Sequence, residues 1–396
     1  MPETPEFEFI TTQDALEDYC DHIADAKFIG FDTEFVSENR YQPELCLIQV
    51  ATEDGYAIID TLAVESIESF WEVLTEGDHV TVAHAAREEF NFCYRAIGRR
   101  PVKLFDVQLA AGMVGLEYPA SYANLVNRVI GEQVDKGETR TDWARRPLTD
   151  RQMHYALSDV IHLKPVFDSL TKKLNSMKRM DWMWGEIDAW QKSLEDVVDK
   201  PQWRRVSGIA SLNRKALAIV RELWLWRDDE ARRRNRSARR VLPDDLIVEL
   251  AKRGTPEISR LKAIRGFENR VSKQAIPEIS DVIEDALSLS KDDYPNRITR
   301  NRSTNLGLLG QFISIALKIV CRQEKIAPQI VGTADELKEF AAWRLKIAKF
   351  DKPPKLATSW RKELVGALIE RILDGELSIS VSDPTADHPL KLDRNS

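Results

Sequence analysis

The spacing of apolar residues changes along the chain and divides it into two kinds of structure. In about the first 170 residues, short apolar runs rich in β-branched residues predict strands at 27–35, 45–51, 55–59 and 79–83. Helical spacing between these runs predicts helices at 12–26, 67–74 and 87–97. Strand pairs near the start followed by strand–helix alternation indicate an α/β domain, a mixed sheet flanked by helices.

Residue types at the element ends support this interpretation. Gly98 follows the third helix in the position of a C′ glycine, which ends a helix without backbone strain. Asp106 is a suitable N-cap for a helix that runs to Met113. One further helical stretch is predicted at 150–166, with its apolar residues on one side.

From about Leu212 the strand signals nearly vanish and helical spacing takes over. It predicts helices at 213–234, 306–322, 334–348 and 360–373, with a polar linker or exposed loop at 291–304. We therefore expect three domains: the α/β domain at 1–200, an all-α domain at 208–292, and a second helical domain at 293–396 that the pattern marks more weakly.

Composition is that of an ordinary folded protein, with 43% hydrophobic and 31% charged residues. The apolar run 312–320 is shorter than a membrane span and contains Lys318, so we expect no membrane segment. Residues 1–9 are acidic and lack the features of a signal peptide. The scattered cysteines argue against a zinc knuckle or a disulfide scaffold and favour the reducing cytoplasm: Cys20, Cys46, Cys93 and Cys321.

The net charge of −7 is unevenly distributed. Residues 203–240 contain twelve Lys and Arg against four Asp and Glu, a local net charge of +8. Because local charge decides what a surface binds, we expect a cluster of arginines there to contact nucleic-acid phosphates. The alternative is a solvated, ion-paired helix face, since Asp228, Asp229 and Glu230 lie alongside. The candidate arginines are Arg232, Arg233, Arg234, Arg236, Arg239 and Arg240.

The strand at 27–35 carries two carboxylates, in the sequence Phe-Asp-Thr-Glu-Phe. Side chains two apart in a strand share a face, so Asp32 and Glu34 project together. Paired carboxylates at the end of an apolar strand resist desolvation, and a hard divalent cation such as Mg²⁺ or Mn²⁺ removes that penalty. The alternative is two solvated acids at a strand end.

The late helix carries a second pair, Tyr155 and Asp159, which are i and i+4 and therefore share a helix face. A phenol beside a carboxylate can orient a water while the carboxylate holds a metal. On its own the spacing is common on helix surfaces.

The combination of these motifs resembles the DEDD exonucleases of the tyrosine subgroup. The stretches FIGFDTEFVSENRYQPELCLIQVA, LFDVQLAA and TRTDWARRPLTDRQMHYALSDVIHL are similar to ribonuclease D, and the resemblance covers roughly Phe28 to Trp190. It implies a ribonuclease-H-like sheet with the acids gathered at one edge around two Mg²⁺ or Mn²⁺ ions. On that pattern Asp32 contacts both metals, Glu34 and Asp159 hold the nucleophile-side metal, and Tyr155 positions the attacking water.

One position departs from the family pattern. The second acidic motif normally has Asp five residues after a His, and here the fifth residue after His84 is Glu89. With one more methylene, Glu89 could ligate the leaving-group metal directly or through water, and we expect a metal-site role. The alternative is that it complements the positive end of a helix that starts near Ala86. We expect His84 itself to be a packing histidine at a strand end.

Arginines near Trp143 leave two possibilities open. Arg140, Arg145 and Arg146 could meet an RNA backbone, or could brace the loop before the Tyr155 helix.

The segment from Ser211 to Ser288 resembles the HRDC domain, with matching residues from Ala216 to Arg232, at 241–245 and around Gly266. Residues 306–392 are a fainter match to a second such domain, for which docking is as plausible a role as RNA contact.

The resemblance implies a 3′→5′ exoribonuclease that acts on single-stranded 3′ ends and tRNA-like precursors and releases nucleoside 5′-monophosphates. We expect no obligate protein partner. Two alternatives remain: a DNA 3′→5′ exonuclease, because the same metal site cleaves either backbone, or a non-catalytic RNA-binding relative that has lost its second metal through Glu89.

Overall fold

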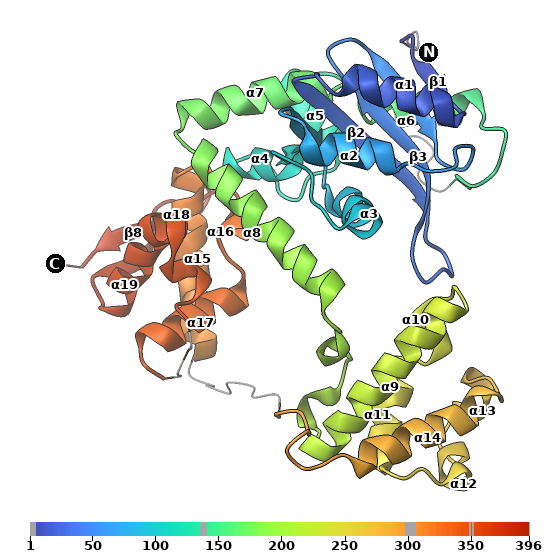
Figure 1. Cartoon of the computed structure of the whole chain (residues 1–396). Coiled ribbons are helices and arrows are strands. Elements are labelled where there is room, and N and C mark those ends of the chain that lie inside the picture. The colour runs from blue at the N-terminus through green and yellow to red at the C-terminus, as the bar shows by residue number, and fades with distance from the viewer. Residues whose placement is uncertain (1–4, 135–140, 298–305, 348–349, 351, 396) are drawn as a thin grey trace.

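The computed structural model describes residues 5–134, 141–297, 306–347, 350 and 352–395. Its N-terminal part contains a six-stranded sheet in the order β1-β4-β3-β2-β5-β6 (Figure 1). Strands β2, β3 and β4 pair antiparallel, whereas β1 joins β4, β5 joins β2 and β6 joins β5 in parallel. The mixed sheet that the sequence predicted is confirmed. Its strands are β1 (Glu8–Ile10), β2 (Phe28–Val36), β3 (Glu44–Ala51), β4 (Tyr56–Asp60), β5 (Val80–Ala83) and β6 (Phe105–Asp106).

Helices cover both faces of this sheet. In this part of the chain the main core combines the sheet with α1 (Gln13–Ile23), α2 (Glu68–Glu76), α3 (Arg87–Ile97), α4 (Val107–Met113), α5 (Tyr122–Ile130), α7 (Leu163–Ser176) and α8 (Met180–Asp199). A smaller cluster on the other face joins Leu47 of β3 and Ile58 of β4 to Ala156 and Leu157 of α6 (Asp150–Ser158). The strand alternation therefore sends neighbouring residues of β2 to two different helical layers.

Local capping signals are confirmed, and one helix prediction is wrong. Gly98 has φ 67°, and the Asp106 carboxylate accepts from the backbone N–H groups of Gln108 and Leu109. The single helix predicted at 150–166 is instead two helices, because α6 ends at Ser158 and α7 starts at Leu163. Leu157 packs in the α6 cluster whereas Leu163 packs in the main core, so the chain must change direction between them.

Residues 203–286 build a core of their own. Its helices are α9 (Arg214–Arg233), α11 (Asp244–Arg253), α12 (Ile258–Lys262), α13 (Phe267–Arg270) and α14 (Ala275–Ser288), and the short α10 (Ala238–Val241) packs on α9 without contributing a core residue. A long helix, α8 (Met180–Asp199), leads from the sheet domain toward this bundle (Figure 1).

The C-terminal segment packs into the main core. Its elements are α15 (Leu306–Gln323), α16 (Pro328–Val331), α17 (Ala334–Arg344), α18 (Ser359–Arg361), the π-helical turn η4 (Lys362–Gly366), α19 (Ala367–Leu373) and strands β7 (Leu377–Val381) and β8 (Leu390–Arg394). The β7–β8 hairpin is not foreshadowed by the helical pattern of the sequence. Of the predicted linker at 291–304, residues 298–304 lie outside the described residues.

Helix α15 is long and apolar enough to cross a membrane by length and composition, with a mean hydropathy of 1.3. Core helices pass the same test, and here one side of α15 is buried in the main core through Ile313, Ala316, Leu317 and Cys321.

The loop between β2 and β3, residues 37–43, extends away from the sheet and meets the HRDC-like bundle at the end of α9 (Figure 1). The Tyr41 hydroxyl donates to Asp228 at 2.9 Å, and the Arg232 guanidinium lies 5.6 Å from the Tyr41 ring centre. The Tyr41 and Ser237 backbone N–H groups donate to Asn235 and Asn39. The strand that carries Asp32 and Glu34 thus continues into a polar contact with the bundle.

Candidate active site

Asp32 and Glu34 lie on the face of β2 that α6 covers. Asp32 is directly opposite Gln49 of β3, and Glu34 is opposite Leu47. Directly opposed residues of an antiparallel pair share a face. Because Leu47 packs against Ala156 and Leu157 of α6, the two carboxylates face the same layer. This confirms the expectation that they project together.

Helix α6 brings Tyr155 and Asp159 to the same place. Asp159 is the C-cap of α6, so it sits where the helix stops and the chain turns toward α7. The Tyr155 hydroxyl hydrogen-bonds the Asp159 carboxylate, and burial, followed by the charges of Asp159, Glu34 and Asp32, raises the pKa of Tyr155. Residues far apart in the sequence therefore share one electrostatic neighbourhood.

Burial and mutual repulsion shift the acids strongly. The pKa of Glu34 is raised to about 8 by burial first and then by Asp159 and Glu89. The pKa of Asp159 is raised to about 7, also by burial, although its bond with Tyr155 opposes the shift. Burial and the charges of Asp159, Glu89 and Glu34 raise the pKa of Asp32 well above its usual value. Each carboxylate is costly to ionise without a cation.

Glu89 reaches the site from the opposite face of β2. The Thr33 hydroxyl donates to its carboxylate at 2.7 Å, and Thr33 points away from Asp32 and Glu34 because side chains alternate along a strand. Burial raises the pKa of Glu89 to about 7, although hydrogen bonds from its own backbone N–H and from Thr33 oppose the shift. Glu89 thus lies near the acids and also interacts with the start of α3, so both interpretations of it remain open.

The carboxylates fit hard cations in donor type. Within the described ranges, no three His, Cys, Asp or Glu side chains are already gathered closely enough to hold a metal ion. Four mutually repelling acids with raised pKa values nevertheless form an all-oxygen donor set of the kind that suits Mg²⁺ or Mn²⁺. Deprotonation and convergence of the acids would accompany cation binding.

Of the neighbouring polar residues, some make structural contacts and others are exposed to solvent. The His84 ring is 3.0 Å from the Ala120 carbonyl and burial lowers its pKa, as a packing histidine requires. Arg146 donates to both Asp60 oxygens at 2.6 and 2.7 Å and so braces the loop before α6. Arg145 is exposed. Arg140 lies outside the described residues.

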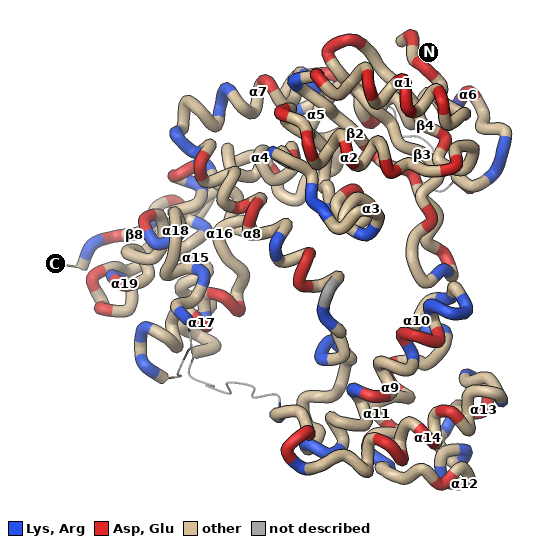
Figure 2. The backbone as a smooth tube through the Cα atoms, viewed as in Figure 1, with Lys and Arg blue, Asp and Glu red and all other residues tan. Residues whose placement is uncertain are grey.

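The predicted arginine cluster is partly neutralised. Arg232 pairs with Asp228 and Asp229, Arg233 and Arg234 pair with Glu230, and Arg239 lies 3.6 Å from Asp244. Arg236 and Arg240 are exposed and make no ion pair with the described residues. Lys and Arg gather around α10, at the junction with the 37–43 loop (Figure 2). Both the phosphate-contact and the ion-paired interpretation therefore describe part of this cluster.

Two residues near the carboxylates escaped the sequence analysis. Thr33 was passed over as the spacer between two acids, although alternation places it on the other face of the strand. Gln49 is a polar residue within the apolar run LCLIQVA, and this interruption was the available signal. Its amide is fully buried and has no hydrogen-bond partner within the part of the chain that the structure describes.

Family models match both folded parts. A 3′-5′ exonuclease model matches residues 7–175, which include all five candidate site residues, and an HRDC domain model matches residues 216–283.

Full-length relatives agree. Ribonuclease D of Bartonella henselae is 30% identical over 382 residues, which cover 94% of this chain and 92% of that protein. Ribonuclease D of Zymomonas mobilis subsp. mobilis is 31% identical over 382 residues, which cover 94% of this chain and 95% of that protein. The crystal structure of Escherichia coli RNase D, an exoribonuclease involved in structured RNA processing, matches with a TM-score of 0.83 at 25% identity and covers 94% of this chain and 99% of that one. The chain belongs to the ribonuclease D family, with a 3′-5′ exonuclease domain followed by an HRDC domain.

Proposed function

We propose that this ribonuclease D family exoribonuclease releases nucleoside 5′-monophosphates from the 3′ ends of structured RNAs such as tRNA precursors, and that it uses two divalent cations. The observation that carries the proposal is that β2, α3 and the end of α6 bring Asp32, Glu34, Glu89 and Asp159 into one electrostatic neighbourhood, in which burial raises the pKa of all four. Such a cluster is costly to maintain unless it holds cations.

The four carboxylates would share the cations, which we take to be Mg²⁺ or Mn²⁺. When bound, the pair supplies stabilisation of the attacking and leaving oxygens of an in-line displacement. Asp32 is central, because the charges of the other three acids all act on it. Tyr155, held by its hydrogen bond to Asp159, orients the attacking water with its hydroxyl.

The exposed Arg236 and Arg240 would contact RNA phosphates at the junction between the HRDC domain and the 37–43 loop.

We propose domain boundaries at 1–200, 208–292 and 293–396, with the last a divergent second HRDC-like domain. A cytoplasmic site of action agrees with four cysteines that are all buried and free of disulfides.

Substitution of the acids tests the active site. Asp32→Asn and Asp159→Asn should each reduce mononucleotide release by more than the ~100-fold that loss of an outer metal partner typically costs. Circular dichroism and thermal unfolding serve as the folding control. Near-normal turnover of either folded variant would place the active site elsewhere, and digestion of matched RNA and DNA strands would reveal a DNA exonuclease.

Glu89 needs a separate test because two interpretations of it remain. If Glu89 serves the leaving-group metal, Glu89→Ala loses far more activity than Glu89→Asp, and Glu89→Asp shifts the Mn²⁺/Mg²⁺ activity ratio toward Mg²⁺. If it only complements the start of α3, Glu89→Ala lowers thermal stability slightly and leaves turnover unchanged. Turnover of the three proteins in each metal decides between them.

A further inference from the structure

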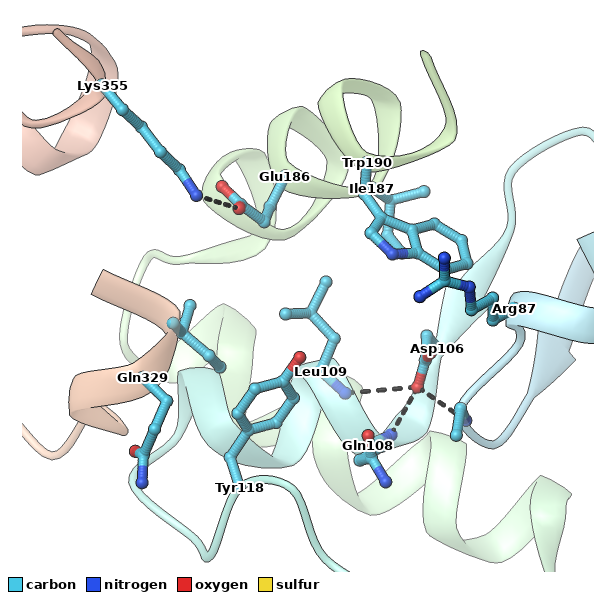
Figure 3. A pocket seen from close by; sticks show the side chains of 12 residues that line it. Arg87, Asp106, Gln108, Leu109, Tyr118, Glu186, Ile187, Trp190, Gln329 and Lys355 are labelled. Carbon is cyan, nitrogen blue, oxygen red and sulfur yellow. Dashed lines mark hydrogen bonds and ion pairs between the residues drawn. The ribbon is translucent and has the colours of Figure 1, made fainter. Parts of the chain in front are cut away.

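A pocket of about 460 Å³ lies where the exonuclease domain meets the C-terminal segment (Figure 3). The exonuclease domain contributes residues from the start of α3 and from α4 and α8, and the C-terminal segment contributes Gln329, Ile330 and Lys355. This volume is within the range of small-ligand sites. Both parts of the molecule are needed to form it.

The pocket adjoins the candidate active site. Arg87, on its wall, begins helix α3 two residues before Glu89. Asp106, on the same wall, is close enough for its charge to raise the pKa of Glu89. A strand whose 3′ end lies at the four carboxylates therefore has this pocket next to it.

The lining carries two basic side chains, Arg87 and Lys355, and two acidic ones, Asp106 and Glu186, beside aromatic surface. Arg87 is exposed and its guanidinium makes no ion pair with the described residues. Lys355 is half-exposed and lies 3.6 Å from both Glu186 and Glu336, and Glu186 is also bound by Arg361 in two bonds of 2.7 Å. Trp190 and Tyr118 supply the aromatic surface, as Figure 3 shows.

We propose that this pocket is an RNA subsite that binds a nucleotide upstream of the two 3′-terminal ones. The base packs against Trp190 or Tyr118, as bases commonly stack on aromatic side chains, and the adjacent phosphates meet Arg87 and Lys355. The C-terminal segment is then part of the substrate path as well as a structural support. This subsite rests on the proposed exoribonuclease function.

The test uses the full-length protein and 5′-labelled oligoribonucleotides from a dinucleotide to an octanucleotide, with binding measured in Ca²⁺ to slow cleavage. Arg87→Gln and Lys355→Gln remove one charge each from opposite walls of the pocket. Each should weaken binding of the longer strands by about tenfold, the usual effect of losing a charge-assisted hydrogen bond, and leave dinucleotide binding unchanged. Arg95→Gln is the matched control, because Arg95 is exposed on the same helix but does not line the pocket.

Three results would overturn the subsite. The first is an equal loss of RNA affinity at every oligonucleotide length, which would assign Arg87 to the metal site. The second is an equal loss of affinity in Arg95→Gln, which would indicate a general charge effect. The third is unchanged RNA binding in both pocket variants. Wild-type protein that releases no mononucleotides from RNA would instead refute the proposed function. If the wild-type protein is active but its RNA affinity does not depend on oligonucleotide length, the subsite alone is refuted.

A different observation concerns Gln49, whose amide is fully buried and has no hydrogen-bond partner among the described residues. Gln49 is directly opposite Asp32 and shares its face of the sheet. A buried, unpaired amide destabilises a fold, so its presence beside a metal-site carboxylate calls for a role in the loaded state.

We infer that Gln49 is a positioning residue, which donates to the Asp32 carboxylate, directly or through one water, when a cation is bound. Carboxylates that hold metals are themselves held by hydrogen bonds, and loss of such a bond commonly weakens metal affinity by about 10- to 100-fold.

Calorimetric Mn²⁺ binding to the full-length protein provides a readout independent of turnover. Gln49→Met, of similar size, should weaken Mn²⁺ binding by about tenfold. Thr81→Val is the matched control, because the Thr81 hydroxyl on β5 is also fully buried and has no partner in the described ranges, but does not face Asp32. It should leave Mn²⁺ affinity unchanged. Unaltered Mn²⁺ affinity in a folded, more stable Gln49→Met protein would show that Gln49 has no role toward the metal.

Discussion

The two helical regions that follow the exonuclease domain are attached to it in different ways. The HRDC domain encloses its own core, and it meets the exonuclease domain through the polar contacts of Tyr41 with Asp228 and Arg232. The C-terminal segment shares its core with the sheet domain. Trp182 and Trp360 stack at 5.0 Å across this junction, and Arg361 binds Glu186 in two bonds.

Two regions of similar helical content can therefore have different physical roles. Apolar burial makes the C-terminal segment and the sheet domain one cooperative unit, because neither can leave without exposing the core. A small polar contact has little such coupling, so the HRDC domain can unfold, or move on its connections, independently.

The largest effect on stability should come from Arg361→Ala. Arg361 is 2% exposed, and its loss leaves the nearly buried Glu186 carboxylate without its main partner, which typically costs about 3–5 kcal/mol. Urea unfolding should show the sheet-domain transition shifted and the HRDC transition unchanged. The control, Arg371→Ala, breaks an exposed pair with Glu376 and should cost less than about 1 kcal/mol. Equal shifts in both variants would contradict the shared-core interpretation.

The stability of the sheet domain should depend on pH more strongly than the stability of the HRDC domain. The raised pKa values of Glu34, about 8, and Asp159, about 7, mean that the metal-free folded state binds more protons than the unfolded state from about pH 4 to 8. Stability of the sheet-domain unit should therefore be greatest below this window and fall as pH rises through it.

Thermal unfolding of metal-free protein at several pH values measures this slope. Added Mg²⁺ or Mn²⁺ should reduce it by stabilising the ionised acids, and the HRDC transition should not share it. If the unfolding temperature of the metal-free sheet domain instead rises from pH 5 to 8, the raised pKa values of Glu34 and Asp159 are contradicted.

A smaller effect is expected in RNA affinity from the exposed arginines. Arg236→Gln or Arg240→Gln should each lower the slope of log affinity against log salt by about 0.7 to 0.9, because one phosphate contact is lost. Arg233→Gln should change the slope less, because Glu230 already neutralises Arg233. Equal slopes in all three variants and wild type would remove the cluster from RNA binding.

The smallest effect should follow Tyr41→Phe, which removes only the hydroxyl that donates to Asp228. The loss of one partly exposed hydrogen bond costs about 1 kcal/mol of docking and leaves the unfolding transitions of both units unchanged. Hydrogen exchange of residues 37–43 and of the end of α9 measures this docking. A large shift in either unfolding transition would show that the junction is more than a polar contact.

Much of the fold and the site was predictable because its signals are local. Strand alternation placed Asp32 beside Glu34, and the capping roles of Gly98 and Asp106 follow from residue type. The apolar pattern at 150–166 correctly predicted helical structure but wrongly predicted one continuous helix. A periodic pattern does not say that Leu157 and Leu163 are buried in different layers.

The amino-acid pattern alone predicted most of the element types, the order of the folded parts and all five candidate active-site positions, with Glu89 left between two interpretations. The element types were predictable because their signals come from residues a few positions apart. Only the tertiary structure showed that Thr33 holds Glu89 and that Gln49 is opposite Asp32. It also decided that the C-terminal segment joins the sheet-domain core and closes a pocket beside the acids. Those contacts join residues far apart in the chain, and their energies come from packing and burial, which no local pattern records.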